Sequence, residues 1–185
     1  MFKIKILGLN FFLIFLSFCL SGCMTNSNNG SKENDLHSEG YIKYQINLKP
    51  SNSSNYEIIV PVLIEETGDI STSMLNLSVS GNGQFEIINT QYGKGLKITG
   101  IGKISINQKS TNDITIAWFS MISNETGGGN AKYWIFFNSS ETNSISIYIH
   151  GEVVFGQKTY LSYISENINT TGWQEINGIK SIKYP

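Results

Sequence analysis

The stretch YIKYQINL, residues 41–48, decides the fold class of this chain. Its apolar side chains fall at every second position, with Lys43, Gln45 and Asn47 between them. This period of two is typical of a β-strand with one buried and one solvated face. The stretch SISIYIH, residues 144–150, repeats the pattern and places its isoleucines inward. Both stretches therefore predict strands of a sheet that covers a core.

Short β-prone segments separated by glycines fill most of the sequence between and after these two stretches. We expect strands over residues 56–64, 85–90, 96–99, 103–108, 114–122, 133–137, 153–164 and 173–184. Many short strands with turn signals at close spacing favour a sandwich over an α/β fold. The prediction is an all-β domain, an antiparallel β-sandwich of jelly-roll or immunoglobulin type with at most one short helix.

Local features refine this prediction. Pro61 cannot donate to a ladder, which favours an edge position or a bulge. Residues 71–77 read as the short helix, with Met74 and Leu75 turned to the core. Residues 114–122 are apolar on both sides, so we expect this segment to be covered on two faces or to meet another surface. The three glycines at 127–129 suit a hairpin connection.

The N-terminus has the layout of an export signal. Lys3 and Lys5 precede an apolar run over residues 6–20, and small residues follow it. The run falls short of the roughly 20 residues that a membrane-spanning helix needs. The motif Leu20-Ser21-Gly22-Cys23 then resembles the lipobox of bacterial and archaeal lipoproteins. The resemblance, which covers only the first 23 residues, implies a lipid on the Cys23 thiol and cleavage just before it.

Two other interpretations of the N-terminus stay open: an ordinary cleaved signal, or an uncleaved helical anchor in which Cys23 is incidental. Under the lipoprotein interpretation, residues 1–22 are the signal peptide. Residues 23–39, rich in Asn, Ser, Gly and charge, are a flexible tether, and residues 40–185 are the β-sandwich domain. The protein is then extracytoplasmic and membrane-anchored at the cell envelope. In this respect it resembles uncharacterised envelope lipoproteins.

The charged residues argue against nucleic-acid binding. The chain has 13 basic residues, all lysine, against 14 acidic ones, and its formal net charge is −1. Arginine supplies the planar fork for phosphate and guanine, and none is present. The two cysteines are Cys19, inside the signal, and Cys23. The predicted domain therefore has no disulfide and no thiol for a metal or a nucleophile.

The inventory of catalytic groups predicts a domain that is not an enzyme. The two histidines are His37, in the tether, and His150 on an outward strand face. A hydrolytic triad needs a positioned histidine base, and a zinc site needs several ligands. We therefore expect no metal and no cofactor. The alternative is a glycoside hydrolase-like enzyme that uses two carboxylates. Its candidates are Glu57, Glu86, Glu152 and Glu175.

Four aromatic residues are the candidates for a ligand or partner face: Trp118, Trp134, Tyr148 and Trp173. Rings on a sheet surface bind protein partners or stack on sugars. The leading hypothesis is a non-catalytic domain that contacts another envelope protein or serves a structural role there. The alternative is a carbohydrate-binding module that uses Trp173 and Tyr148. The alternative for Trp118 and Trp134 is that both are core residues with no binding role. Trp173 is the ring that we expect to be exposed.

Asn-x-Ser/Thr triplets recur along the chain and would accept N-linked sugars in a host with that machinery. Beyond Asn29, they begin at Asn52, Asn76, Asn124, Asn138 and Asn169. Because Asn, Ser and Thr are abundant here, chance accounts for several of them.

Overall fold

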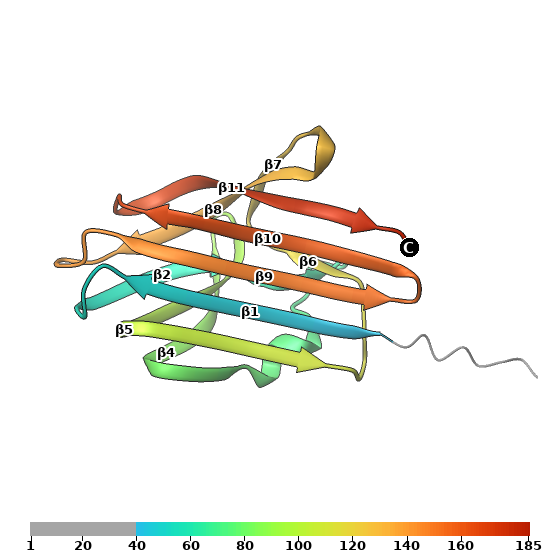
Figure 1. The fold of residues 1–185 in the computed structure, drawn as a ribbon, viewed down its shortest axis with the longest axis horizontal. Coiled ribbons are helices and arrows are strands. Elements are labelled where there is room, and N and C mark those ends of the chain that lie inside the picture. The colour runs from blue at the N-terminus through green and yellow to red at the C-terminus, as the bar shows by residue number, and fades with distance from the viewer. Residues whose placement is uncertain (1–39) are drawn as a thin grey trace, which may run out of the picture. The chain divides into compact units, whose positions relative to one another are not determined.

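The computed structural model describes residues 40–185. The predicted signal, Cys23, His37, Asn29 and the tether lie outside the described residues. The strands are β1 (Tyr41–Pro50), β2 (Asn55–Pro61), β3 (Leu63–Glu65), β4 (Ser78–Thr90), β5 (Gly93–Ser110), β6 (Ala117–Phe119), β7 (Ile122–Glu125), β8 (Asn130–Asn138), β9 (Ile145–Phe155), β10 (Lys158–Ile168) and β11 (Gly172–Lys183). Two short 3₁₀ helices, η1 (Thr72–Asn76) and η2 (Gly127–Gly129), complete the domain (Figure 1). The all-β prediction is confirmed.

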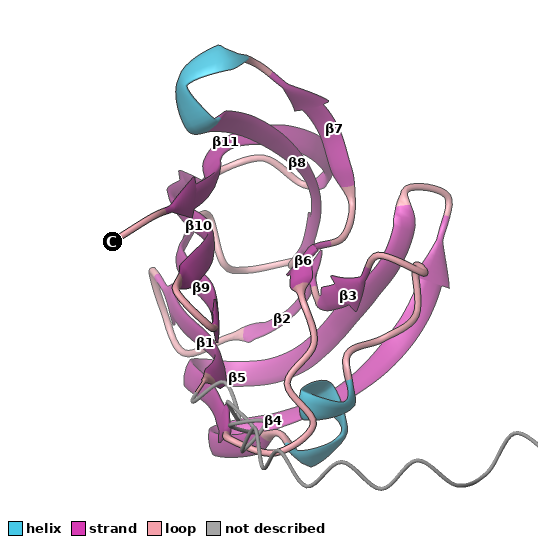
Figure 2. Cartoon of the chain, turned by 90° about the vertical axis from the view of Figure 1, so that its right-hand side faces the viewer, coloured by secondary structure: helices cyan, strands magenta, loops and turns pink. Residues whose placement is uncertain are grey.

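A nine-stranded antiparallel sheet forms the domain. Its order is β1-β9-β10-β11-β8-β2-β5-β4, and β7 adds to β8. β1 also pairs with β5, so the sheet closes on itself. In Figure 2, β1, β9 and β10 form one wall of the domain and β8 forms the facing wall. This sandwich-like arrangement confirms the predicted architecture.

The alternation that decides the fold class is confirmed in β1 and β9. In β1 the side chains of Ile42, Tyr44, Ile46 and Leu48 are all fully buried. The isoleucines of β9 are also buried, and His150 between them faces outward. Residues 153–164, expected to be β-structure, are split between β9 and β10 by a turn at Gly156, whose φ is +60°.

Residues 78–110 form two long strands, so the prediction of three short strands there is wrong. Most of the glycines in this region lie within these strands and do not end them. β4 and β5 are long, and β5 pairs with β2 through its first half and with β1 through its second. The change of partner falls at Gly100–Gly102. A Cβ on Gly100 would collide with the Ile104 side chain, and Gly102 has φ +67°. Glycine there lets one strand bend from one wall to the next instead of terminating it.

The small sheet β3-β6 fills the interior. Phe119 of β6 meets Tyr44 and Tyr133 edge-on, with ring centroids 6.1 and 5.7 Å apart. We call these three residues the inner aromatic trio. Phe119 and Leu63 pack against β9 at Gly151, since a Cβ there would lie 2.6 Å from Phe119 and 2.9 Å from Leu63. The Tyr44 hydroxyl donates to the Pro61 carbonyl at 2.6 Å, which satisfies a buried polar group.

Pro61 does not lie on an edge strand, because β2 runs between β5 and β8. It is the last residue of β2 and lies beyond residues 57–59, the part that pairs with β8. There the chain leaves the large sheet and enters β3. A residue without an N–H is tolerated where a strand stops pairing on one side.

The predicted short helix is present as the 3₁₀ helix η1, with two differences. Met74 is buried, but Leu75 is 71% exposed, so its expected inward position is wrong. Ser71, which precedes the helix, also makes no capping hydrogen bond with its side chain; its Oγ lies 3.1 Å from that of Ser73. With three residues per turn, consecutive side chains of so short a helix cannot all face the core.

The apolar segment 114–122 is covered on both sides, as predicted, but it is not one strand. Ala117, Phe119 and Met121 are buried, whereas Ile114, Ile116, Trp118 and Ile122 are half-buried against the core. Only residues 117–119 pair as β6. Met121 has a left-handed backbone, with φ +57°, and turns the chain into β7.

Candidate functional site

Four aromatic side chains from three chain segments meet on the outer surface of the sheet. Trp134 and Phe136 come from β8, Trp173 from β11, and Tyr92 from the turn between β4 and β5. Tyr92 stacks on Trp134 with ring centroids 4.1 Å apart and an interplanar angle of 13°. It meets Trp173 edge-on at 4.8 Å, and Phe136 lies 5.4 Å from Trp173. All four are half-buried. We call them the outer aromatic cluster.

Strand alternation and register bring this cluster together. Phe136 lies opposite Trp173 in the β8–β11 pair and opposite Ile59 in the β8–β2 pair. The residues that alternate with Trp134 and Phe136 on β8 are Tyr133, Ile135 and Phe137, and all three are buried on the core side. One β-strand thus presents aromatic rings to both faces of the sheet.

The outer aromatic cluster has its own buried base. Ile59 is 7% exposed and Met121 is 3% exposed, yet neither belongs to the main core cluster. Gly95 adjoins both, since a Cβ there would lie 2.8 Å from Ile59 and 2.9 Å from Met121. A second, smaller hydrophobic layer therefore lies on the outside of the sheet, separate from the main core.

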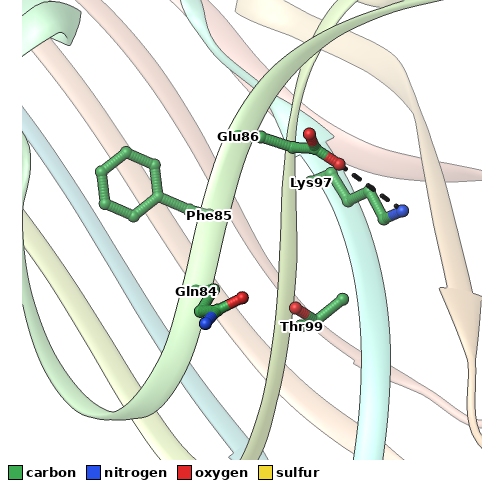
Figure 3. A pocket seen from close by; sticks show the side chains of 5 residues that line it. All are labelled: Gln84, Phe85, Glu86, Lys97 and Thr99. Carbon is green, nitrogen blue, oxygen red and sulfur yellow. Dashed lines mark ion pairs between the residues drawn. The ribbon is translucent and has the colours of Figure 1, made fainter.

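A row of polar side chains continues this outer face from the end of β8 across β2, β5 and β4. Glu86, Lys97 and Ile59 lie opposite one another, in line with Phe136 and Trp173. We call the polar row Gln84, Glu86, Lys97, Thr99, Glu57 and Asn138. Figure 3 shows the β4 and β5 members on one side of the sheet and Phe85 pointing the other way. With Phe85, these β4 and β5 residues line a shallow pocket of about 210 Å³.

Lys97 links two carboxylates within the polar row. Its Nζ lies 3.2 Å from Glu57 Oε2 and 3.6 Å from Glu86 Oε1. Hydrogen bonding to Glu57, together with the charges of both carboxylates, raises the pKa of Lys97. In a two-carboxylate hydrolase the glycosidic bond lies between the two acids. Here the Lys97 ammonium group lies next to both carboxylates.

The other two glutamates considered for hydrolysis lie apart from this pair. Glu175, on β11, is 3.7 Å from Lys132. Glu152, on β9, accepts a hydrogen bond from the Tyr41 hydroxyl at 2.8 Å. Of the four candidates, only Glu57 and Glu86 share a partner.

The aromatic residues singled out in the sequence are divided among three places. Trp134 and Trp173 belong to the outer aromatic cluster. Tyr148 packs edge-on against Tyr163, with centroids 5.4 Å apart, on the outer face of β9 and β10. Trp118 packs edge-on against Tyr160 at 5.2 Å, and the Lys180 ammonium lies 4.8 Å from its ring centroid. The pair expected for sugar binding, Trp173 and Tyr148, is therefore not part of one cluster.

Two members of the outer aromatic cluster were not among the sequence candidates. Phe136 alternates with Trp134 within one segment, so the period of two would have placed both on one face. Tyr92 lies in a two-residue turn, where no periodicity applies. Its contact with Trp134 depends on how far the β4–β5 hairpin extends, which the local sequence does not encode.

His150 lies in a hydrogen-bonded and charged group on the outer face of β9. Its Nε2 is 3.3 Å from Glu152 Oε2, and its Nδ1 is 3.3 Å from the Tyr148 hydroxyl. Its side chain is only 18% exposed. Burial lowers the pKa of His150; Glu152 opposes this shift and Lys43 adds to it. Within residues 40–185, no three His, Cys, Asp or Glu side chains gather as a metal site.

The asparagines of all five Asn-x-Ser/Thr triplets in the described part are exposed: Asn52, Asn76, Asn124, Asn138 and Asn169. Asn52 also has a structural contact. Its Nδ2 donates to the Glu141 carbonyl and its Oδ1 accepts from Thr142, each at 2.8 Å. This bond ties the β1–β2 loop to the β8–β9 loop. A glycan on Asn52 would compete with it.

The described part of the chain contains no helix with the length and apolar character needed to cross a membrane. Comparison of the chain with protein-family models, curated proteins and solved structures found no match.

Proposed function

We propose that this chain is a lipid-anchored protein of the cell envelope whose β-sandwich domain binds a partner without catalysis. The outer aromatic cluster is the binding face in this proposal. The anchor rests on Leu20-Ser21-Gly22-Cys23, placed directly after an export signal. A lipid adds about 0.8 kcal/mol of membrane affinity per buried CH₂, so two chains or more hold a protein durably.

The observation that supports a binding face is a second hydrophobic layer outside the main core. The core already buries the inner faces of both walls. Tyr92, Trp134, Phe136 and Trp173 nevertheless gather at the solvent, above the buried Ile59 and Met121. Tyr, Trp and Phe are enriched in the centres of protein interfaces, where they carry most of the binding energy. A protein partner of the envelope fits this surface best.

The second candidate ligand is a glycan, and the polar row favours it. Carboxylates, amides and a hydroxyl beside aromatic rings can bind the hydroxyl groups of a sugar. A sugar platform needs free ring faces side by side, however. Tyr92 and Trp134 instead cover each other's faces at 4.1 Å, which supports a protein partner over a sugar.

Cross-linking from the cluster tests the binding face. In the full chain, p-benzoylphenylalanine replaces Trp173 in one version and Ser165, an exposed residue on β10, in the other. Irradiation of cells should give a discrete adduct from position 173 and none from position 165. The Trp134→Ala change should then remove that adduct. A protease-sensitive adduct identifies a protein partner, and a periodate-sensitive, protease-resistant adduct identifies a glycan. Identical adducts from both positions would contradict the proposal.

Membrane fractionation with metabolic lipid labelling tests the anchor. The wild-type chain should carry the label and sediment with membranes. Cys23→Ser should lose both properties, with Cys19→Ser as the matched control that retains them. A Cys23→Ser chain that stays membrane-bound with the same label would show that the anchor lies elsewhere.

A further inference from the structure

Within residues 40–185, one edge of the large sheet is a long strand that has no neighbouring strand on its outer side. β4 ends the strand order and pairs with β5 alone along its 13 residues. No backbone hydrogen bond from any other described segment reaches residues 78–90. A row of free N–H and C=O groups is a template for another strand.

The hairpin geometry shows which backbone groups are free. A two-residue turn joins Thr90 to Gly93, and the residues that close such a turn exchange hydrogen bonds. Because hydrogen-bonded and non-bonded pairs alternate, the even-numbered residues from Asn82 to Thr90 bond to β5. The odd-numbered residues, Gly83, Phe85, Ile87 and Asn89, direct their N–H and C=O groups away from the sheet.

This edge lacks the usual protection against strand pairing. Natural edge strands carry Lys, Pro or inward charges, or are very short. β4 has no Pro, and its one charged residue, Glu86, is paired with Lys97 at 3.6 Å. A bulge after Ser80 interrupts the ladder, but residues 82–90 are regular. Phe85, which is 38% exposed, lies near the middle of that regular part.

We propose that β4 is a self-association site at which a second copy of this chain adds its own β4 in antiparallel orientation. The preferred register places Phe85 on the two-fold axis, opposite Phe85 of the second copy. Both rings then lose solvent exposure. Gln84 lies opposite Glu86, an amide beside a carboxylate, and Gly83 lies opposite Ile87. The surface is self-complementary, as a two-fold interface requires.

The neighbouring register is disfavoured by charge. With Glu86 on the axis, the same free backbone groups would pair, but two carboxylates would face each other directly. Like charges in directly opposite positions destabilise a strand pair. The register with Phe85 on the axis avoids this contact and also joins the polar rows of the two copies into one surface. The interface is independent of the outer aromatic cluster, so it goes beyond the proposed function.

Cysteine cross-linking tests the site in the full chain. The described domain has no cysteine, so Phe85→Cys introduces one at the axis. Treatment of membranes with bismaleimidoethane should convert most of this variant to a dimer on a denaturing gel. Ser165→Cys, exposed on β10, should remain monomeric. The parent chain reports any cross-linking through Cys23. Equal dimer yields from positions 85 and 165 would overturn the proposal.

Introducing a charge at the interface gives a second, independent measurement. Phe85→Lys places two like charges on the axis, and Ile179→Lys adds a charge at a residue that is also 38% exposed but lies on a strand paired on both sides. Sedimentation of the detergent-solubilised full chain should give a dimer for wild type and Ile179→Lys and a monomer for Phe85→Lys. A monomeric wild type, or a dimer that survives Phe85→Lys, would overturn the proposal.

Discussion

The inner aromatic trio and the outer aromatic cluster are both groups of packed aromatic rings, one inside the large sheet and one on its outer face. Tyr44, Phe119 and Tyr133 are no more than 2% exposed and meet edge-on in the core. The outer rings are half-buried, and two of them stack face to face. Tyr133 and Trp134 are consecutive residues that belong to different groups. Position relative to the sheet, not residue type, thus separates rings that hold the fold from rings that are available to a partner.

The largest expected difference between the two groups is in stability. Phe119→Ala removes a buried ring and leaves a cavity closed by Tyr44, Tyr133 and Leu63. Such a change costs about 3–5 kcal/mol of the free energy of unfolding. Phe136→Ala, in the outer aromatic cluster, should cost roughly 1 kcal/mol, because water can enter the space. Urea denaturation measures both values, and equal losses would remove the distinction.

Overpacking near the inner aromatic trio should have the next largest effect. Gly151→Ala places a methyl group 2.6 Å from Phe119 and 2.9 Å from Leu63. The forced shift of the β3-β6 sheet should cost about 1–3 kcal/mol. The control is Gly127→Ala, where nothing lies within 4 Å of the new carbon. A neutral Gly151→Ala would mean that β3-β6 packs loosely.

Alkaline pH should act on the core through its buried tyrosines. Burial raises the pKa of Tyr44, Tyr56 and Tyr133 above the usual range. The folded state then holds these protons more tightly than the unfolded chain. The stabilising contribution of these three hydroxyls is therefore fully present below a pH of about 10, the pKa of tyrosine in the unfolded chain. It is lost as the pH rises above that value. Absorbance titration at alkaline pH should show these three hydroxyls ionising only with unfolding; ionisation without unfolding would contradict their burial.

A smaller effect is expected at mildly acidic pH, on the outer face of β9. Because the pKa of His150 is lowered in the fold, the unfolded chain takes up the proton first, at a pH of about 6.5. Stability should fall as the pH drops from there through the folded pKa. His150→Gln should lose less stability than wild type between neutral and acidic pH. The measurement is the free energy of unfolding of both proteins as a function of pH. Parallel curves would argue against this role of His150.

The fold class could be predicted from the sequence because burial is periodic in β1 and β9. The long bent strands could not, because glycines at 81, 83, 100 and 102 signal a turn as readily as a bulge within a strand. The candidate site was only half predictable. Trp134 and Trp173 were singled out, but their meeting depends on the register of β8 against β11, which no local pattern encodes. Tyr92 reaches Trp134 only because the β4–β5 hairpin extends that far.

The most direct test of the proposed binding face combines two readouts on Trp173→Ala. The free energy of unfolding should fall by only about 1 kcal/mol, as for a half-exposed ring. With p-benzoylphenylalanine in place of Tyr92 as the cross-linking position, the same change should reduce the partner adduct at least tenfold, which corresponds to about 1.4 kcal/mol of binding free energy. An unfolding loss as large as that of Phe119→Ala would show that the outer aromatic cluster is structural, and an undiminished adduct would show that it is not the binding face.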